Sequence, residues 1–154
     1  MAAHYLLVDS QREPVAQIAE QLHAQVVEKR RTCGFVSYQI DRNVMVQYLL
    51  ALEAQLDIQV VQQSEGAMHP DDSQALHHAA SVLFESPLFL AIPDEPTIQG
   101  LLHDVQDMHA QEEVDLVFID TAGIDGFNGS SQEGKLESLK QQLHAIGFAE
   151  GLQC

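Results

Sequence analysis

Short apolar runs alternate with longer segments of helical periodicity along this sequence, and that alternation constrains the fold more than any other feature. Each run holds four to seven residues, rich in Val, Ile, Leu and Phe, as is typical of a buried β-strand. The five predicted strands cover residues 5–8, 34–40, 58–61, 88–92 and 116–119.

The remaining long segments carry apolar residues three and four positions apart, which places those residues on one face of a helix. The five predicted helices cover residues 15–26, 45–56, 75–83, 98–108 and 136–146. Gly147 follows the last of them and predicts a left-handed C-cap. Strands that alternate with helices favour right-handed crossovers and a mainly parallel sheet. The expected fold class is therefore α/β, with a five-stranded sheet between two layers of helices.

The composition limits the number of domains and the kind of partner. A chain of 154 residues that is 45% hydrophobic can bury one core, so we expect a single α/β domain over residues 1–154. It has 7 basic against 23 acidic residues, a formal net charge of −16, and no Lys or Arg between Asn43 and Gly134. That charge repels nucleic acids and anionic membranes. We expect no direct binding of nucleic acid, and either a protein partner or self-association.

Two further observations concern the cellular compartment. The sequence has no apolar run long enough to span a membrane and opens without a secretory signal. Cys33 and Cys154 form no pair with metal-ligand spacing and are too few for a disulfide scaffold. We therefore expect a cytoplasmic protein without a membrane span.

Aspartates close three of the five predicted strands: Asp9, Asp41 and Asp120. In an open parallel sheet, ligands bind beyond the carboxyl ends of the strands. Carboxylate oxygens are the ligands that Mg²⁺ prefers, so these three residues are candidate metal ligands. The alternative interpretation is that each aspartate caps the turn or helix that follows it.

The last predicted strand and its exit form the most specific string, Asp115-Leu-Val-Phe-Ile-Asp-Thr-Ala-Gly123. It resembles the Walker B and switch segment of the P-loop NTPase class that includes signal-recognition-particle GTPases and the partition and septum-site ATPases. The strands and helices predicted over residues 4–61 are also arranged in an order similar to that of this class. The resemblance implies a Rossmann-like, P-loop NTPase-like fold in which Asp120 holds magnesium and Gly123 donates its backbone N–H towards the γ-phosphate.

The phosphate-binding loop of that class is missing after the first strand. The class has Gly-x-x-x-x-Gly-Lys-Ser/Thr there, whereas residues 8–15 contain no glycine and no lysine, and put Asp9 and Glu13 where phosphates would lie. A later string, Gly129 to Leu136, fits Gly-x-x-x-x-Gly-Lys and makes Lys135 a candidate phosphate ligand, although a surface loop explains it as well. The sequence thus favours a pseudo-NTPase that binds partners, catalyses no reaction and needs no cofactor.

Two alternatives fit the same elements. A magnesium-dependent enzyme or nucleotide-binding protein would use the strand-end aspartates, but no nucleophile or base motif accompanies them. A phospho-receiver-like domain needs an aspartate after the third strand and a lysine after the fifth, where this chain has Gln62 and Thr121. The strand order distinguishes the folds, because only the P-loop-like order places strand 116–119 directly beside strand 5–8.

Overall fold

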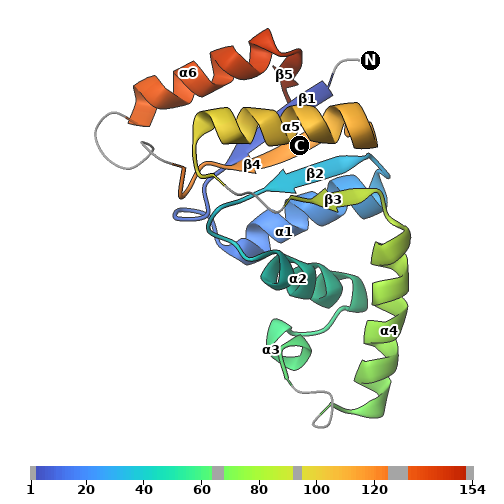
Figure 1. Cartoon of the computed structure of the whole chain (residues 1–154). Coiled ribbons are helices and arrows are strands. Elements are labelled where there is room, and N and C mark those ends of the chain that lie inside the picture. Colours follow the sequence, from blue (N-terminus) through green and yellow to red (C-terminus); the bar gives the residue numbers. More distant parts are fainter. Residues whose placement is uncertain (1–2, 64–67, 92–94, 125–131, 152–154) are drawn as a thin grey trace.

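Five parallel strands form one sheet in the order β3-β2-β4-β1-β5 (Figure 1). The structure is a computed structural model and describes residues 3–63, 68–91, 95–124 and 132–151. The strands are β1 (Ala3–Val8), β2 (Cys33–Val36), β3 (Leu88–Leu90), β4 (Leu116–Asp120) and β5 (Phe148–Glu150). All four strand pairings are parallel, which confirms the predicted fold class.

β4 lies directly beside β1, in a register that runs from His4 opposite Leu116 to Val8 opposite Asp120. On its other edge β4 pairs with β2. This is the neighbour relation that the P-loop-like interpretation requires. The receiver-like alternative is wrong, because a receiver order would separate these two strands.

Helices cover both faces of the sheet (Figure 1). They are α1 (Val15–His23) with the π-helical turn η1 (Ala24–Glu28), α2 (Arg42–Ala54), α3 (Ile58–Val61), α4 (Pro70–Glu85), α5 (Ile98–Glu112) and α6 (Gln132–Ala145). Side chains of β4 alternate between two cores: Leu116 and Phe118 pack with α1 and α2, whereas Val117 and Ile119 pack with α5 and α6. All five residues of β4 are buried, as expected for a strand covered on both faces.

The predicted strand at 58–61 is wrong, because these residues form the short helix α3. The Asp57 carboxylate accepts a hydrogen bond from the Gln59 backbone N–H at 2.9 Å and so caps the first turn. None of the four residues is buried. The run reads as a strand because it holds three β-branched residues, but an aspartate cap and the absence of a buried face favour a helical turn.

The fifth strand is β5, which the sequence pattern did not predict. It has three residues, of which Phe148 is buried and the other two are exposed. A single buried residue at the edge of a sheet produces no alternation that a periodicity search could detect.

The remaining predictions of local structure agree with the elements, with shifted ends. The strand predicted over 34–40 ends at Val36, because the chain turns at Ser37. Gly147 follows α6 with φ +97°, and its N–H donates to the His144 carbonyl at 3.1 Å, which confirms the predicted C-cap. Cys33 is buried in β2, whereas Cys154 lies outside the described residues. Within the described ranges, no helix combines the length and apolar character that crossing a membrane requires.

Candidate functional site

Asp120 stands at the carboxyl end of β4 and is completely buried. Its Oδ1 atom accepts hydrogen bonds from the backbone N–H groups of Ser10 at 3.0 Å and Ala122 at 3.1 Å. Its Oδ2 atom accepts a hydrogen bond from the Ser37 hydroxyl at 2.7 Å. One carboxylate therefore ties together the segments that follow β1, β2 and β4, and hydrogen bonds to a charged acceptor are the strong ones.

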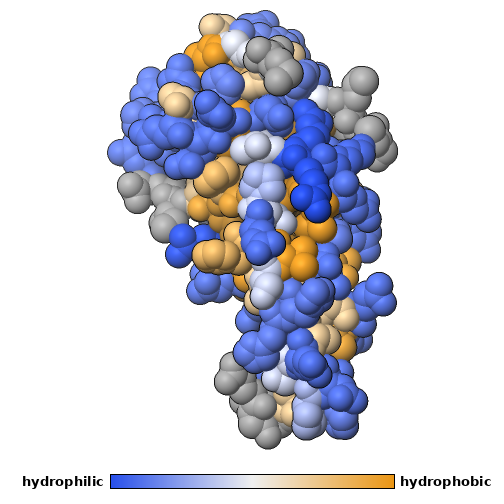
Figure 2. All heavy atoms as spheres, turned by 90° about the vertical axis from the view of Figure 1, so that its right-hand side faces the viewer, coloured by the Kyte–Doolittle hydropathy of each residue, from blue (hydrophilic) through white to orange (hydrophobic). Residues whose placement is uncertain are grey.

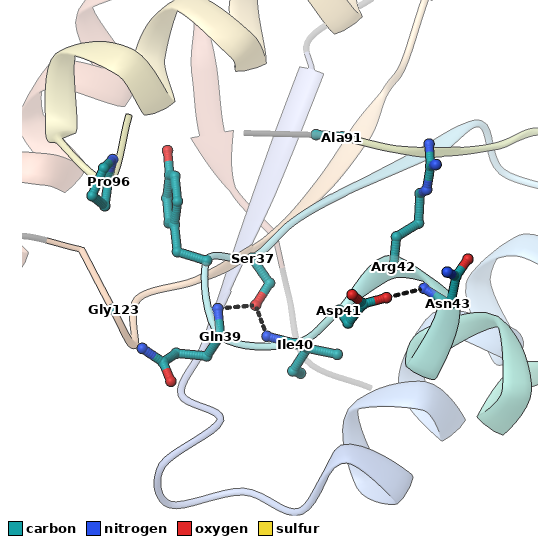
Figure 3. A pocket seen from close by; sticks show the side chains of 10 residues that line it. Ser37, Gln39, Ile40, Asp41, Arg42, Asn43, Ala91, Pro96 and Gly123 are labelled. Atoms are coloured by element: carbon teal, nitrogen blue, oxygen red, sulfur yellow. Dashed lines mark hydrogen bonds between the residues drawn. The ribbon is translucent and has the colours of Figure 1, made fainter. Parts of the chain in front are cut away.

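Ser37 is the residue at this site that sequence reasoning missed. Besides donating to Asp120, its hydroxyl oxygen accepts hydrogen bonds from the backbone N–H groups of Gln39 at 3.2 Å and Ile40 at 2.9 Å (Figure 3). These bonds turn the chain away from the sheet directly after β2. A serine directly after the apolar residues Phe35 and Val36 was the signal that could have indicated the end of this strand.

The backbone N–H groups of the loop between β1 and α1 donate hydrogen bonds to other groups of the protein. Ser10 donates to Asp120, Gln11 donates to the Asp9 carboxylate at 3.0 Å, and both Arg12 and Glu13 donate to the Asp9 carbonyl at 3.0 and 2.8 Å. Pro14, which precedes α1, has no N–H. From residue 10 to residue 13, every backbone N–H group therefore donates a hydrogen bond within the protein, and residue 14 has no N–H group.

A cavity of about 630 Å³ opens at the same edge of the sheet (Figure 3). It lies beyond the ends of β2 and β3, where a parallel sheet is expected to bind ligands. Its walls come from the segment that follows β2, from the start of α2 and from the exits of β3 and β4. The lining residues are Ser37, Tyr38, Gln39, Ile40, Asp41, Arg42, Asn43, Ala91, Pro96 and Gly123.

Two residues in this wall have unusual local environments. The Tyr38 hydroxyl is buried and finds no hydrogen-bond partner among the described residues. Burial, followed by the charges of Asp104 and Glu95, raises the pKa of Tyr38 to about 12, so the phenol is neutral at physiological pH. Gly123 has φ +82°, and a Cβ atom there would approach the Gln39 Nε2 atom to 2.7 Å. The positive φ favours glycine at this position, whereas the exposed Gln39 side chain could move away from a Cβ atom.

The three predicted metal ligands all follow strands at the carboxyl edge, but the structure gives them different partners. The Asp9 carboxylate accepts a hydrogen bond within its own loop, and its Oδ2 atom lies 3.7 Å from the Nε atom of Arg12. Asp41 caps α2 by accepting from the Asn43 N–H at 2.7 Å, beyond the end of β2. Asp120 forms the buried cluster with Ser37. In the described part of the chain, no group of three or more His, Cys, Asp or Glu side chains is placed to hold a metal ion. The magnesium site stays a prediction.

The predicted phosphate ligand Lys135 lies in the first turn of α6 and is half-buried. Residues 129–131 of its glycine-rich string lie outside the described residues, so the loop that would surround a phosphate is not described. Gly134, which precedes it, faces open space, because a Cβ atom added there would have no other atom within 4 Å. Phosphate binding by Lys135 stays a prediction too.

Comparison with known proteins supports the fold and assigns a family. No curated protein matches this sequence. A solved structure described as an ATPase domain superposes with a TM-score of 0.70 at 10% sequence identity, over 97% of this chain and 56% of that one. This chain therefore spans just over half the length of that structure, and the likeness at such low identity concerns the fold alone.

The family assignment confirms the broader part of the resemblance seen in the sequence, that to P-loop ATPases. The matching family is described as DnaB-like helicase C terminal domain, and its sequence profile matches residues 15–147. That range includes the buried Asp120 and Ser37 and the cavity wall, and leaves out the loop after β1. The chain belongs to the DnaB-like helicase C-terminal domain family.

Proposed function

We propose that this protein is a non-catalytic member of its family, a pseudo-ATPase module that acts by binding another protein. The loop after β1 carries the proposal. In P-loop proteins, consecutive free N–H groups of this loop surround the phosphates, and a lysine neutralises them. Here residues 10–14 offer no free backbone N–H group, and Asp9 and Glu13 contribute negative charge instead.

The hydrogen bonds of Asp120 support the same proposal. The matching aspartate of P-loop NTPases holds magnesium directly or through water. In this protein both carboxylate oxygens accept hydrogen bonds from the protein, one of them from a serine hydroxyl at 2.7 Å. A nucleotide with magnesium would have to compete with these bonds in a buried position, which costs binding free energy.

The charge supports a partner other than nucleic acid. The net charge is −16, and residues 43–134 contain no Lys or Arg that could contact a phosphate backbone. The finer resemblance of residues 114–123 to signal-recognition-particle-type GTPases fits a domain that docks onto a larger assembly or onto a second copy. We infer that binding and regulation, not nucleotide hydrolysis, are its functions.

Calorimetric titration with ATP, and separately with GTP, in the presence of Mg²⁺ tests the proposal. We expect no binding tighter than about 1 mM, because the loop after β1 has no free backbone N–H group and carries the carboxylates of Asp9 and Glu13. Micromolar affinity would contradict the proposal. In that case the Lys135→Ala variant is the matched test: lost affinity would assign the phosphate site to the start of α6, and Gly123 would be its expected neighbour.

A further inference from the structure

An apolar groove lies between α2, α4 and the edge strand β3. Figure 2 shows hydrophobic side chains gathered in the middle of this face. The groove has a volume of about 280 Å³, below the roughly 300 Å³ at which small-molecule sites begin. We call it the α4 groove; its lining residues are Val46, Leu49, Leu50, Ala80, Leu83, Phe84, Leu88 and Leu90.

Phe84 forms one wall of this groove and is 92% exposed. Among the described residues it is the one large hydrophobic side chain in such an exposed position. Burying a phenylalanine side chain is favourable, and this protein alone does not gain that free energy. An exposed aromatic residue beside an apolar groove is typical of a protein-binding surface.

A second hollow, of about 390 Å³, adjoins the first and shares Ala80 and Phe84 with it. Its other walls are polar and comprise His77, Ser81 and Glu85. Within the described part of the chain, no ion pair engages the Glu85 carboxylate. Phe84 therefore separates an apolar groove from a hollow that contains an unpaired negative charge.

The charge of the surrounding elements indicates the chemistry of the occupant. All residues that line the two hollows belong to the stretch from Asn43 to Gly134, which holds sixteen carboxylates and no Lys or Arg. A second copy of the chain would bring another net charge of −16 to this face, and an anionic membrane would be repelled in the same way. A partner with basic residues is complementary.

The shape of the surface favours a helix as the binding segment. The groove lies between α2 and α4, which pack against each other, and such grooves accept the apolar ridge of a third helix. β3 has three residues and offers too short an edge for an added strand. We infer that the α4 groove binds an amphipathic helix of a partner protein, with aliphatic or aromatic residues on one face and Lys or Arg beside them.

This inference rests on the proposed function for the premise that the domain acts through a protein partner. It concerns a different surface, so the two can fail separately. Micromolar nucleotide binding would overturn the pseudo-ATPase proposal without changing what binds beside Phe84, and a failed peptide experiment would leave the nucleotide result unchanged.

A designed peptide serves as the probe. It carries leucine at positions i, i+3, i+4 and i+7 of a helix and lysine on its other face, with a fluorescent label for anisotropy measurements. The matched control peptide has glutamate in place of each lysine. We expect saturable binding of the lysine peptide to the whole protein and no binding of the glutamate peptide.

Variants of the protein locate the binding surface. We expect Phe84→Ser to weaken binding of the lysine peptide about tenfold, as for the loss of an aromatic anchor. Glu85→Gln should weaken it about two- to threefold, whereas Glu112→Gln, which removes the same charge from the end of α5, should leave it unchanged. Circular dichroism of each variant checks that the fold is kept.

Three results would overturn the inference. Equal affinity of the wild type and Phe84→Ser would mean that overall charge, and not the α4 groove, holds the peptide. Equal binding of the glutamate peptide would remove the argument from charge. A dimer of the protein alone in sedimentation velocity that Phe84→Ser dissociates would assign the groove to a second copy of the chain.

Discussion

Ser37 and Asp120 show how a pair of residues organises the carboxyl edge of this sheet. The two side chains are buried and lie 83 positions apart in sequence, and the hydroxyl donates to the carboxylate at 2.7 Å. Through its other oxygen Asp120 holds the N–H of Ser10, so the segments that leave β1, β2 and β4 are fixed to one another. A buried carboxylate needs such donors, because an unpaired one would cost far more than these bonds contribute.

The Ser37→Ala variant should destabilise the protein by about 2–3 kcal/mol. The substitution removes the donor to Asp120 and the acceptor for the N–H groups of Gln39 and Ile40, and leaves buried polar groups unsatisfied. Urea denaturation followed by circular dichroism measures the change. Ser81→Ala is the control, because that hydroxyl bonds a carbonyl on an exposed face of α4; equal midpoints for the two variants would contradict the role assigned to Ser37.

At the scale of the elements, burial explains why β4 was predicted, why β5 was missed and why 58–61 was misassigned. β4 is fully buried, and its apolar run is unmistakable in the sequence. β5 was missed because it contributes one buried residue, and 58–61 was misassigned because its three β-branched residues resemble a strand although they have no buried face. A helix cap, unlike burial, can be recognised from a single residue. Asp57 caps the first turn of α3, where the apolar pattern predicted a strand.

The candidate site was predicted to the same extent. Asp120 was found because it directly follows a strongly apolar run, and an aspartate in that position can be recognised from the sequence alone. Its partner Ser37 could not be found in the same way, since it lies inside the run 34–40 and its role depends on a contact 83 positions away. The hydrogen bonds that engage the backbone N–H groups of the loop after β1 also depend on the folded geometry. The lack of glycine and lysine in this loop nevertheless indicated that it is not a phosphate-binding loop.

The two glycines at the ends of α6 give a matched test of helix energetics. Gly134→Ala should stabilise the protein by up to about 1 kcal/mol, because Gly134 lies within the helix and a Cβ atom there meets no other atom. Gly147→Ala should destabilise it by about 1 kcal/mol, because φ is +97° although space is equally open. Thermal unfolding of both variants measures the difference. Shifts of the same sign would contradict the position of the helix end.

At the scale of the whole molecule, the topology places a ligand-binding position at the carboxyl edge of the sheet, and the net charge limits which ligands can bind there. The chain leaves β1 and β2 towards α1 and α2 on one face, and leaves β4 towards α6 on the other, so the exits of these strands diverge around the Asp120 cluster. Such a divergence is where α/β sheets bind ligands. The net charge of −16 then selects against anionic ligands and favours cations or basic partners throughout the surface.

Magnesium binding is the whole-molecule property that distinguishes a cation site from a screened acidic surface. If Asp9, Asp41 and Asp120 held the ion together, bound magnesium would stabilise the fold in proportion to ln(1 + [L]/Kd) and raise the melting temperature, and Asp120→Asn would abolish that rise. If the ion acts only on the clustered carboxylates, any divalent cation raises the melting temperature by screening their repulsion. Calcium measured beside magnesium separates the two cases, since they differ in the coordination they require.

We expect the second outcome, because each of the three carboxylates already accepts hydrogen bonds from the protein. The matched control for Asp120→Asn is Asp72→Asn, which removes the same charge from the first turn of α4, away from the strand ends. Differential scanning calorimetry should show the same magnesium-dependent rise in melting temperature for both variants, whatever their starting stabilities. A rise that disappears only in Asp120→Asn, and that calcium does not reproduce in the wild type, would establish a magnesium site and make the enzyme the better interpretation of this fold.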